Sequence, residues 1–93
     1  MSTKFDVTEA VEEIRWTLAA HGFAPRDADP TDYQNGDDSS LRFKVGTRYG
    51  EVTVQIVRED RTVEPVRATS SEGLVRVINR VDALAAAHNR AFK

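Results

Sequence analysis

The chain contains no cysteine among its 93 residues, which excludes disulfides, thiolate metal sites and a cysteine nucleophile. Apolar runs are short throughout, well below the roughly 18 residues that a membrane-spanning helix requires. The start of the chain, through Asp6, lacks the apolar segment of a signal peptide. We therefore expect a cytoplasmic protein that does not contact membranes, folded as one compact domain over residues 1–93.

Sequence features of catalysis and cofactor binding are equally scarce. There is no phosphate-binding Walker loop, no dinucleotide-binding glycine pattern and no pair of histidines at the spacing of metal ligands. The two histidines, His21 and His88, fall near the ends of predicted helices, where structural roles are expected. The sequence predicts no catalytic residue, no cofactor and no metal, and we do not expect an enzyme.

Residues 24–40 contain five aspartates, two prolines and an Asn-Gly step, a composition typical of loops. A short strand near residues 23–26 is the one regular element that this region would allow. A calcium-binding EF-hand loop starting at Asp27 would place Asp32 where that motif requires glycine and Asp38 where it requires glutamate. The segment is interpreted as a solvated acidic loop.

Charge is distributed unevenly between the two halves of the chain. Residues 1–40 carry nine acidic and three basic side chains, a net charge of −6, whereas residues 41–93 carry a net charge of +4. Either the halves neutralise each other across the folded surface, or they form two patches of opposite sign that steer a partner. The first interpretation is favoured.

Residues 41–68 predict an antiparallel sheet of three strands. Apolar and polar residues alternate in LRFKVG and in EVTVQIV, so one face of each strand is expected to be buried. A glycine-bracketed loop over residues 46–50 would join them as a hairpin. The predicted register pairs Val45 with Val52, Phe43 with Val54, and Leu41 with Ile56.

A third strand is predicted over residues 62–68. Pro65 cannot donate a hydrogen bond to a neighbouring strand, so this strand is expected at a sheet edge or with that nitrogen toward solvent. A three-residue turn before it would direct Val66 and Ala68 inward, and a two-residue turn would direct Val63 and Pro65 inward. The first register is preferred because the second also directs Arg67 into the core.

Apolar residues at helical spacing predict helices over residues 7–21 and 70–89. Asp6 is the expected N-cap of the first helix, and Gly22 its terminator. The second is expected to begin with a capping box, Thr69-Ser70-Ser71-Glu72. Because each element has one apolar face, the predicted fold is an α+β two-layer sandwich of α-β-β-β-α order, with both helices on one face of the three-stranded sheet.

Trp16 breaks the pattern of the first helix, because it lies opposite the apolar stripe and beside three glutamates. Either the acidic loop covers it, or it anchors another protein, since tryptophan is enriched at binding hot spots. The second helix offers basic residues and small alanines on its outer face. The predicted protein-binding residues are Trp16, Glu9, Glu12, Glu13, Arg76, Arg80 and Arg90.

The alternative function is nucleic-acid binding through the outer face of the sheet and the hairpin tip. Its predicted residues are Arg42, Lys44, Arg48, Tyr49 and Arg58. The element order resembles that of double-stranded RNA-binding domains and of the small toxins that share their topology, and His21-Gly22-Phe23 matches the end of the first helix in those toxins. The lysine cluster of the RNA-binding family and the catalytic histidine of the toxins have no counterpart.

A domain without recognisable chemistry usually acts by contact, so the preferred interpretation is a small protein-binding module. An adaptor, a chaperone-like dimer or a small inhibitor of the kind that phages and mobile elements encode would fit this description. The partner is expected to be another protein, with a homodimer the simplest case, and nucleic acid is the less favoured partner.

Overall fold

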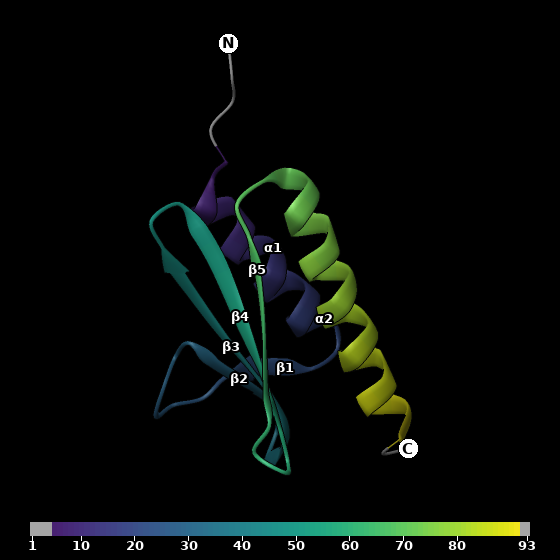
Figure 1. Cartoon of the computed structure of the whole chain (residues 1–93). Coiled ribbons are helices and arrows are strands. Elements are labelled where there is room, and N and C mark those ends of the chain that lie inside the picture. Colours follow the sequence, from purple (N-terminus) through teal and green to yellow (C-terminus); the bar gives the residue numbers. More distant parts are fainter. Residues whose placement is uncertain (1–4, 92–93) are drawn as a thin grey trace.

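The computed structural model describes residues 5–91 (Figure 1). Residues 1–4 and 92–93 lie outside this part, and with them the start of the chain, for which the sequence predicts no signal peptide. The elements in chain order are α1 (Val7–Ala20), β1 (Phe23–Pro25), β2 (Asp32–Asn35), β3 (Asp38–Arg48), β4 (Glu51–Arg58), β5 (Val63–Ala68) and α2 (Ser71–Ala91).

The sheet has five antiparallel strands in the order β1-β2-β3-β4-β5, so the prediction of three strands is wrong. The additional strands are β1, which lies where the sequence allowed a short strand near residues 23–26, and β2, which arises within the predicted acidic loop of residues 24–40. Tyr33 is the one buried apolar side chain of β2, and it pairs with Phe43 of β3. The other residues of β2 are polar, so the strand carries almost none of the alternation that the longer strands show.

The β3–β4 hairpin is confirmed, but the predicted register is wrong by two residues. Phe43 pairs with Ile56 and Val45 with Val54, and the strands continue to Arg48 and from Glu51. The turn therefore contains two residues rather than five. A shift of two residues keeps every side chain on its own face, so the apolar pattern could not distinguish the two registers.

The strand β5 follows the preferred register, with Val66 packed against the core and Ala68 buried. The backbone N–H of Arg58 donates to the carbonyl of Thr62 at 3.0 Å, which leaves a three-residue turn between them. As predicted for a strand that contains Pro65, β5 lies at an edge of the sheet.

Both helices begin and end close to their predicted bounds. The Asp6 carboxylate accepts hydrogen bonds from the backbone N–H groups of Thr8 and Glu9 at 3.0 and 3.2 Å, as expected of an N-cap. Gly22 follows α1 with a φ of 84°, in the left-handed region that glycine adopts without strain. At α2 the cap is Ser70, whose hydroxyl accepts from the Gly73 N–H at 3.1 Å.

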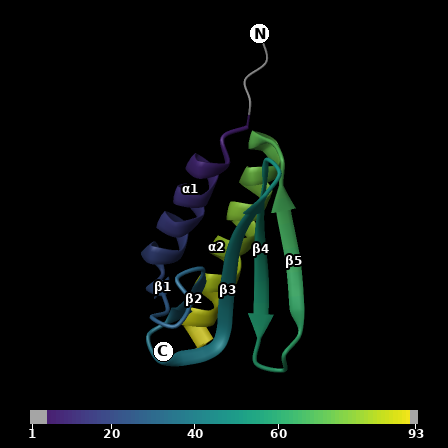
Figure 2. The same cartoon turned by 90° about the vertical axis from the view of Figure 1, so that its left-hand side faces the viewer.

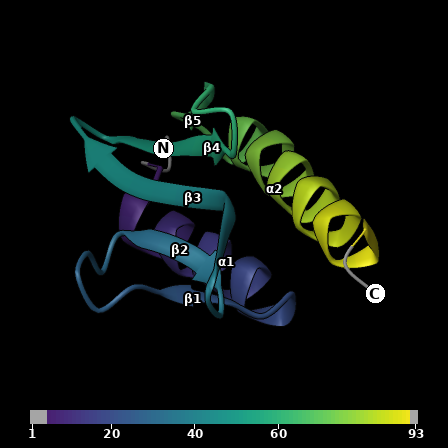
Figure 3. The ribbon, with the colours of Figure 1, turned by 90° about the horizontal axis from the view of Figure 1, so that it is seen from below.

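The two helices lie on the same face of the sheet, as predicted, and the opposite face is turned away from them (Figures 2 and 3). The core between the layers is continuous. It consists of apolar side chains from the buried face of each helix and from the inward positions of the strands, led by Ile14, Leu18, Phe23, Phe43, Val54, Ile56 and Val81. No helix within residues 5–91 is both long and apolar enough to cross a bilayer.

Candidate functional site

A shallow apolar hollow of about 270 Å³ lies between α1 and β1, with Trp16 on its border. Positions 12, 15, 16 and 19 of α1 form one flank because residues three and four apart share a helix face. We call this hollow the Trp16 groove. Its lining residues are Glu12, Arg15, Trp16, Ala19, Phe23, Ala24, Pro25 and Tyr33.

The floor of the Trp16 groove is formed by buried aromatic side chains. Phe23 and Tyr33 are almost fully buried, so only small parts of their rings reach the groove. The Phe23 ring packs edge-on against Phe43, with ring centroids 5.2 Å apart. The floor is therefore part of the closely packed hydrophobic core.

Trp16 itself is 68% exposed. The sequence left open whether residues 24–40 cover this indole, and the structure shows that they do not, because they are occupied with β1, β2 and the start of β3. An indole exposed to this extent beside an apolar hollow is uncommon on a soluble monomer.

The three predicted acidic neighbours of Trp16 are all on the exposed side of α1. Glu9, Glu12 and Glu13 form no ion pair with any of residues 5–91. Their charges are therefore not neutralised by the described part of the chain. Glu12 lines the Trp16 groove together with Arg15, so these four exposed side chains of α1 give this side of the helix a net charge of −2.

The basic residues predicted on α2 do not form one available surface. Arg80 donates from Nε and Nη2 to the two oxygens of Glu64 on β5, at 2.9 and 2.8 Å, and Arg58 donates to the same carboxylate at 2.9 Å. The hydrogen bonds from Arg80 and then from Arg58 lower the pKa of Glu64 to about 2. Arg76 and Arg90 are exposed and form no ion pair within residues 5–91.

The residues predicted to bind nucleic acid do not form a common basic face. Arg58, which the sequence placed beside the β4–β5 turn, pairs with Leu41 and therefore belongs to the helix-covered side of the sheet. The strand β4 runs through Arg58, one residue beyond the predicted strand EVTVQIV. Arg48 lies over the ring of Tyr49, with its guanidinium carbon 5.3 Å from the ring centroid.

The two remaining cations of the predicted nucleic-acid surface are held by carboxylates. Asp32, only 2% exposed, accepts one hydrogen bond from Arg42 and one from Arg26. Lys44 lies 3.6 Å from a carboxylate oxygen of Asp29. Both acids come from the segment that the sequence assigned to a loop, and each reduces the positive potential that would attract a phosphate.

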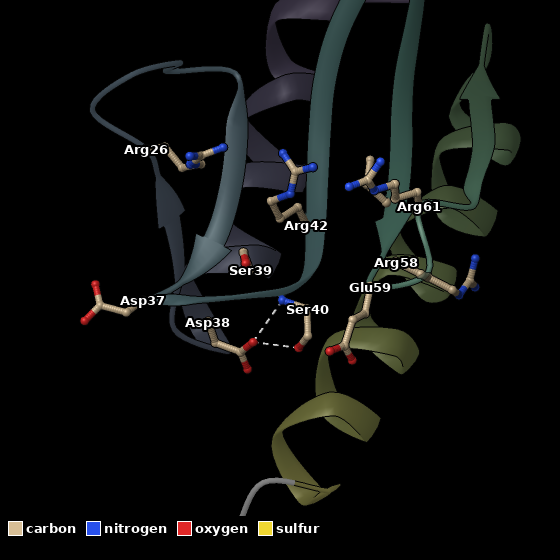
Figure 4. Close-up of a pocket in the computed structure, with 10 residues that line it drawn as sticks. Arg26, Asp37, Asp38, Ser39, Ser40, Arg42, Arg58, Glu59 and Arg61 are labelled. Carbon is tan, nitrogen blue, oxygen red and sulfur yellow. Dashed lines mark hydrogen bonds between the residues drawn. The ribbon is translucent and has the colours of Figure 1, made fainter.

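A wider hollow of about 680 Å³ lies at the end of the sheet near the β2–β3 and β4–β5 turns (Figure 4). Arg26, Arg42 and Arg61 follow one border, and acidic side chains follow the other. The charges of the two borders nearly balance, so the hollow has no strong preference for an anion. Its lining residues are Arg26, Asp37, Asp38, Ser39, Ser40, Arg42, Val57, Arg58, Glu59 and Arg61.

Each histidine pairs with an aspartate from a different part of the chain. His21 Nε2 lies 2.7 Å from an Asp82 carboxylate oxygen, and His88 Nε2 lies 2.9 Å from one of Asp38. Hydrogen bonds from Ser40, and less so from His88, lower the pKa of the Asp38 carboxyl. The pairs join α1 to α2 and α2 to the start of β3, in agreement with the structural roles expected from the sequence.

Two asparagines complete this polar junction, and sequence reasoning missed both. Asn35 donates to the His21 carbonyl at 3.2 Å and to the Asn89 side chain at 2.9 Å, and Asn89 donates to the same carbonyl at 2.8 Å. In the sequence, Asn35 is recognisable only as part of the Asn35-Gly36 turn signal. No local pattern could have indicated a contact with a residue 54 positions away.

Within residues 5–91 no three histidine or acidic side chains are grouped closely enough to hold a metal ion. The aspartates of residues 24–40 are distributed instead among turns and ion pairs. Asp29, for example, accepts from the backbone N–H and the hydroxyl of Thr31. Asp38 likewise accepts from the backbone N–H and the hydroxyl of Ser40, and Asp32 is paired with two arginines.

Comparisons with family models, curated proteins and solved structures found no match for this chain. The element order that resembled double-stranded RNA-binding domains is also not retained, because β1 and β2 intervene between α1 and the three predicted strands. The geometry of the surface is therefore the basis for a functional proposal.

Proposed function

We propose that this chain is a non-catalytic protein-binding domain, and that the Trp16 groove is its contact surface. The observation that carries the proposal is the 68% exposure of Trp16 beside an apolar hollow whose floor is part of the core. Tryptophan is the residue most typical of interface hot spots, where a partner excludes water from its ring.

The free energy available at this site is sufficient for a specific contact. An indole that is two-thirds exposed leaves on the order of 150 Å² of surface uncovered. Covering that area would contribute roughly 3 to 4 kcal/mol before the entropic cost of association. The remaining affinity would have to come from the rest of the groove and its charged border.

The border defines the chemistry of the partner. The unpaired carboxylates of Glu9, Glu12 and Glu13 favour a partner that carries lysine or arginine beside its apolar anchor. The groove is smaller than typical small-molecule pockets of 300 Å³ or more, as its volume is about 270 Å³. A single apolar side chain of a protein is therefore a better match than a small-molecule ligand.

Strand addition is a less suitable mode of binding for this sheet. Both open edges contain a proline, Pro25 in β1 and Pro65 in β5. The backbone N–H of Arg58 on β4 donates to the carbonyl of Thr62 at the start of β5. Backbone groups along an antiparallel strand point alternately toward and away from the neighbouring strand, so the nitrogen of Pro65, three residues later, points toward the free edge. An added strand would meet no donor at that position.

Nucleic-acid binding, the alternative function, has less support. Asp32 and Asp29 partly neutralise Arg42 and Lys44, and Arg58 faces the helices. The basic residues that remain exposed are dispersed over several elements. A site of that kind would bind phosphate weakly and without sequence preference.

The proposal can be tested by selecting short random peptides, displayed on phage, that bind the purified chain. Trp16→Ala should weaken the binding of selected peptides by roughly 30-fold or more in titration calorimetry, as expected for a hot-spot tryptophan. The melting temperature should remain close to the wild-type value, because the side chain is mostly exposed and alanine favours helix.

Val75→Ala is the matched control, because Val75 is also an exposed apolar residue on a helix but lies on α2, away from the groove. It should leave peptide affinity unchanged. Failure to select any peptide would contradict the proposal. Peptides that bind the Trp16→Ala variant as tightly as the wild type would contradict it equally.

A further inference from the structure

The tip of the β3–β4 hairpin is the second exposed aromatic feature of this protein. Tyr49 and Gly50 form a two-residue turn with φ angles of 50° and 76°. Tyr49 is 94% exposed, and its ring contacts the guanidinium of the preceding Arg48. Figure 3 shows the β3–β4 turn projecting beyond the helices.

Tyrosine is an unfavourable residue for this turn. A two-residue hairpin turn with positive φ at both central residues favours Asn-Gly or Asp-Gly, because asparagine and aspartate tolerate the left-handed region. A bulky aromatic residue in that region is a conformational outlier. Tyr49 is therefore unfavourable in this turn, and its ring remains 94% exposed despite the contact with Arg48.

An unfavourable residue whose ring is left almost wholly exposed suggests a function outside the fold. The hairpin tip combines an exposed ring with the positive charge of Arg48. The Trp16 groove has an apolar floor, and the helix side that borders it carries Glu9, Glu12 and Glu13 against one cation, Arg15, a net negative charge. The ring of the tip matches the apolar floor of the groove, and the positive charge of Arg48 matches the net negative charge beside the groove.

We propose that the Trp16 groove receives Tyr49 from a second copy of this chain. This inference rests on the proposed function and names the partner. In a single chain the tip does not occupy the groove, since Tyr49 is almost fully exposed and does not line the hollow. Each copy carries one tip and one groove, so a reciprocal pair closes into a dimer and a non-reciprocal contact extends into a chain of copies.

The experiment is sedimentation velocity over a range of protein concentrations, with variants at the tip and in the groove. The wild type should associate reversibly. Tyr49→Asn should weaken association by roughly 30-fold or more, and its monomer should melt about 4 °C higher because asparagine suits the turn. Tyr49→Phe keeps the ring and should associate within a few-fold of the wild type.

A mixture of two inactive variants gives the most specific test. Trp16→Ala has an intact tip and a damaged groove, and Tyr49→Asn has the reverse. Each alone should be monomeric, whereas their equimolar mixture should form a heterodimer through one intact contact. The heterodimer keeps one of the two contacts, so it should bind less tightly than the wild-type dimer. A mixture that shows no heterodimer up to roughly 100-fold above the wild-type dissociation constant would overturn the inference.

The outcomes separate this inference from the proposed function. If Tyr49→Asn associates as tightly as the wild type while Trp16→Ala no longer associates, the groove binds a part of the second copy other than the tip. Unchanged association in both variants would reject the groove itself as the contact. A wild type that is monomeric at all concentrations would overturn the second copy as partner, and peptide selection would still decide whether the groove binds protein.

Discussion

The ion-pair cluster between β5 and α2 gives the prediction that the structure defines most completely. Glu64 accepts three hydrogen bonds from guanidinium groups, two from Arg80 and one from Arg58, all between 2.8 and 2.9 Å. We expect Glu64→Gln to destabilise the protein at neutral pH, because glutamine removes the negative charge and leaves two arginines beside each other.

The magnitude follows from the Glu64 pKa. A carboxyl whose pKa falls from its usual 4.5 to about 2 on folding contributes at most about 3.4 kcal/mol at neutral pH. The side chain is 32% exposed, so solvent screening reduces the contribution to about 1 to 2 kcal/mol. Because the folded-state pKa is lowered, this stability is present above about pH 4.5 and is lost as the pH falls toward 2.

Urea unfolding at intervals between about pH 7 and pH 3 measures this contribution. The free energy of unfolding of Glu64→Gln should lie about 1 to 2 kcal/mol below the wild type at pH 7, and the difference should shrink at the acid end. Glu59→Gln is the control, since Glu59 is exposed and forms no ion pair within residues 5–91. Equal stability of the two variants, or a difference that grows toward low pH, would refute the reasoning.

Three further predictions follow from the described contacts. Asp32→Ala should destabilise the fold by about 3 kcal/mol in urea unfolding, because it leaves two arginines unpaired beside a buried site, whereas exposed Asp37→Ala should change stability by less than about 0.5 kcal/mol. Gly22→Ala should cost about 1 kcal/mol and lower the melting temperature by roughly 4 to 8 °C, since φ there is 84°. Binding to duplex RNA at physiological salt should be weaker than about 1 μM by fluorescence anisotropy, and submicromolar binding that Arg42→Ala with Lys44→Ala weakens would contradict this.

The sequence predicted those elements in which burial imposes a regular pattern. Two helices, the β3–β4 hairpin and β5 were all identified, because Ile14 and Leu18, or Phe43 and Val45, recur at the period of their element. The N-cap at Asp6 was identified for a similar reason, since capping depends on neighbours in sequence. Local signals were therefore sufficient wherever the stabilising contact is itself local or periodic.

β2, the strand that the sequence did not predict, is stabilised by contacts distant in sequence. β2 is built around Tyr33, which packs beside Phe43, and around Asp32, which is buried between Arg26 and Arg42. A buried aspartate on the outer face of a sheet resembles a loop residue until its arginine partners are known. The predicted acidic loop was thus mistaken because side-chain pairing across strands cannot be seen from composition.

The candidate site was predicted in part. The helical pattern placed Trp16 and its three glutamates on one exposed side, which the structure bears out. The groove beside them was not foreseen, because it requires β1 at the edge of the sheet. Arg80 was expected to face a partner, and its bidentate contact with Glu64 appears only when β5 and α2 are packed together.

Trp16 is the only tryptophan in the chain, so intrinsic fluorescence reports directly on the Trp16 groove. The dilute monomer should emit at the long wavelength typical of an indole in water, because the side chain is 68% exposed. When a selected peptide or a second copy binds, the emission maximum should move to shorter wavelength along the same binding curve that calorimetry or sedimentation records. Binding that saturates by those methods while the emission of Trp16 stays unchanged would contradict the account.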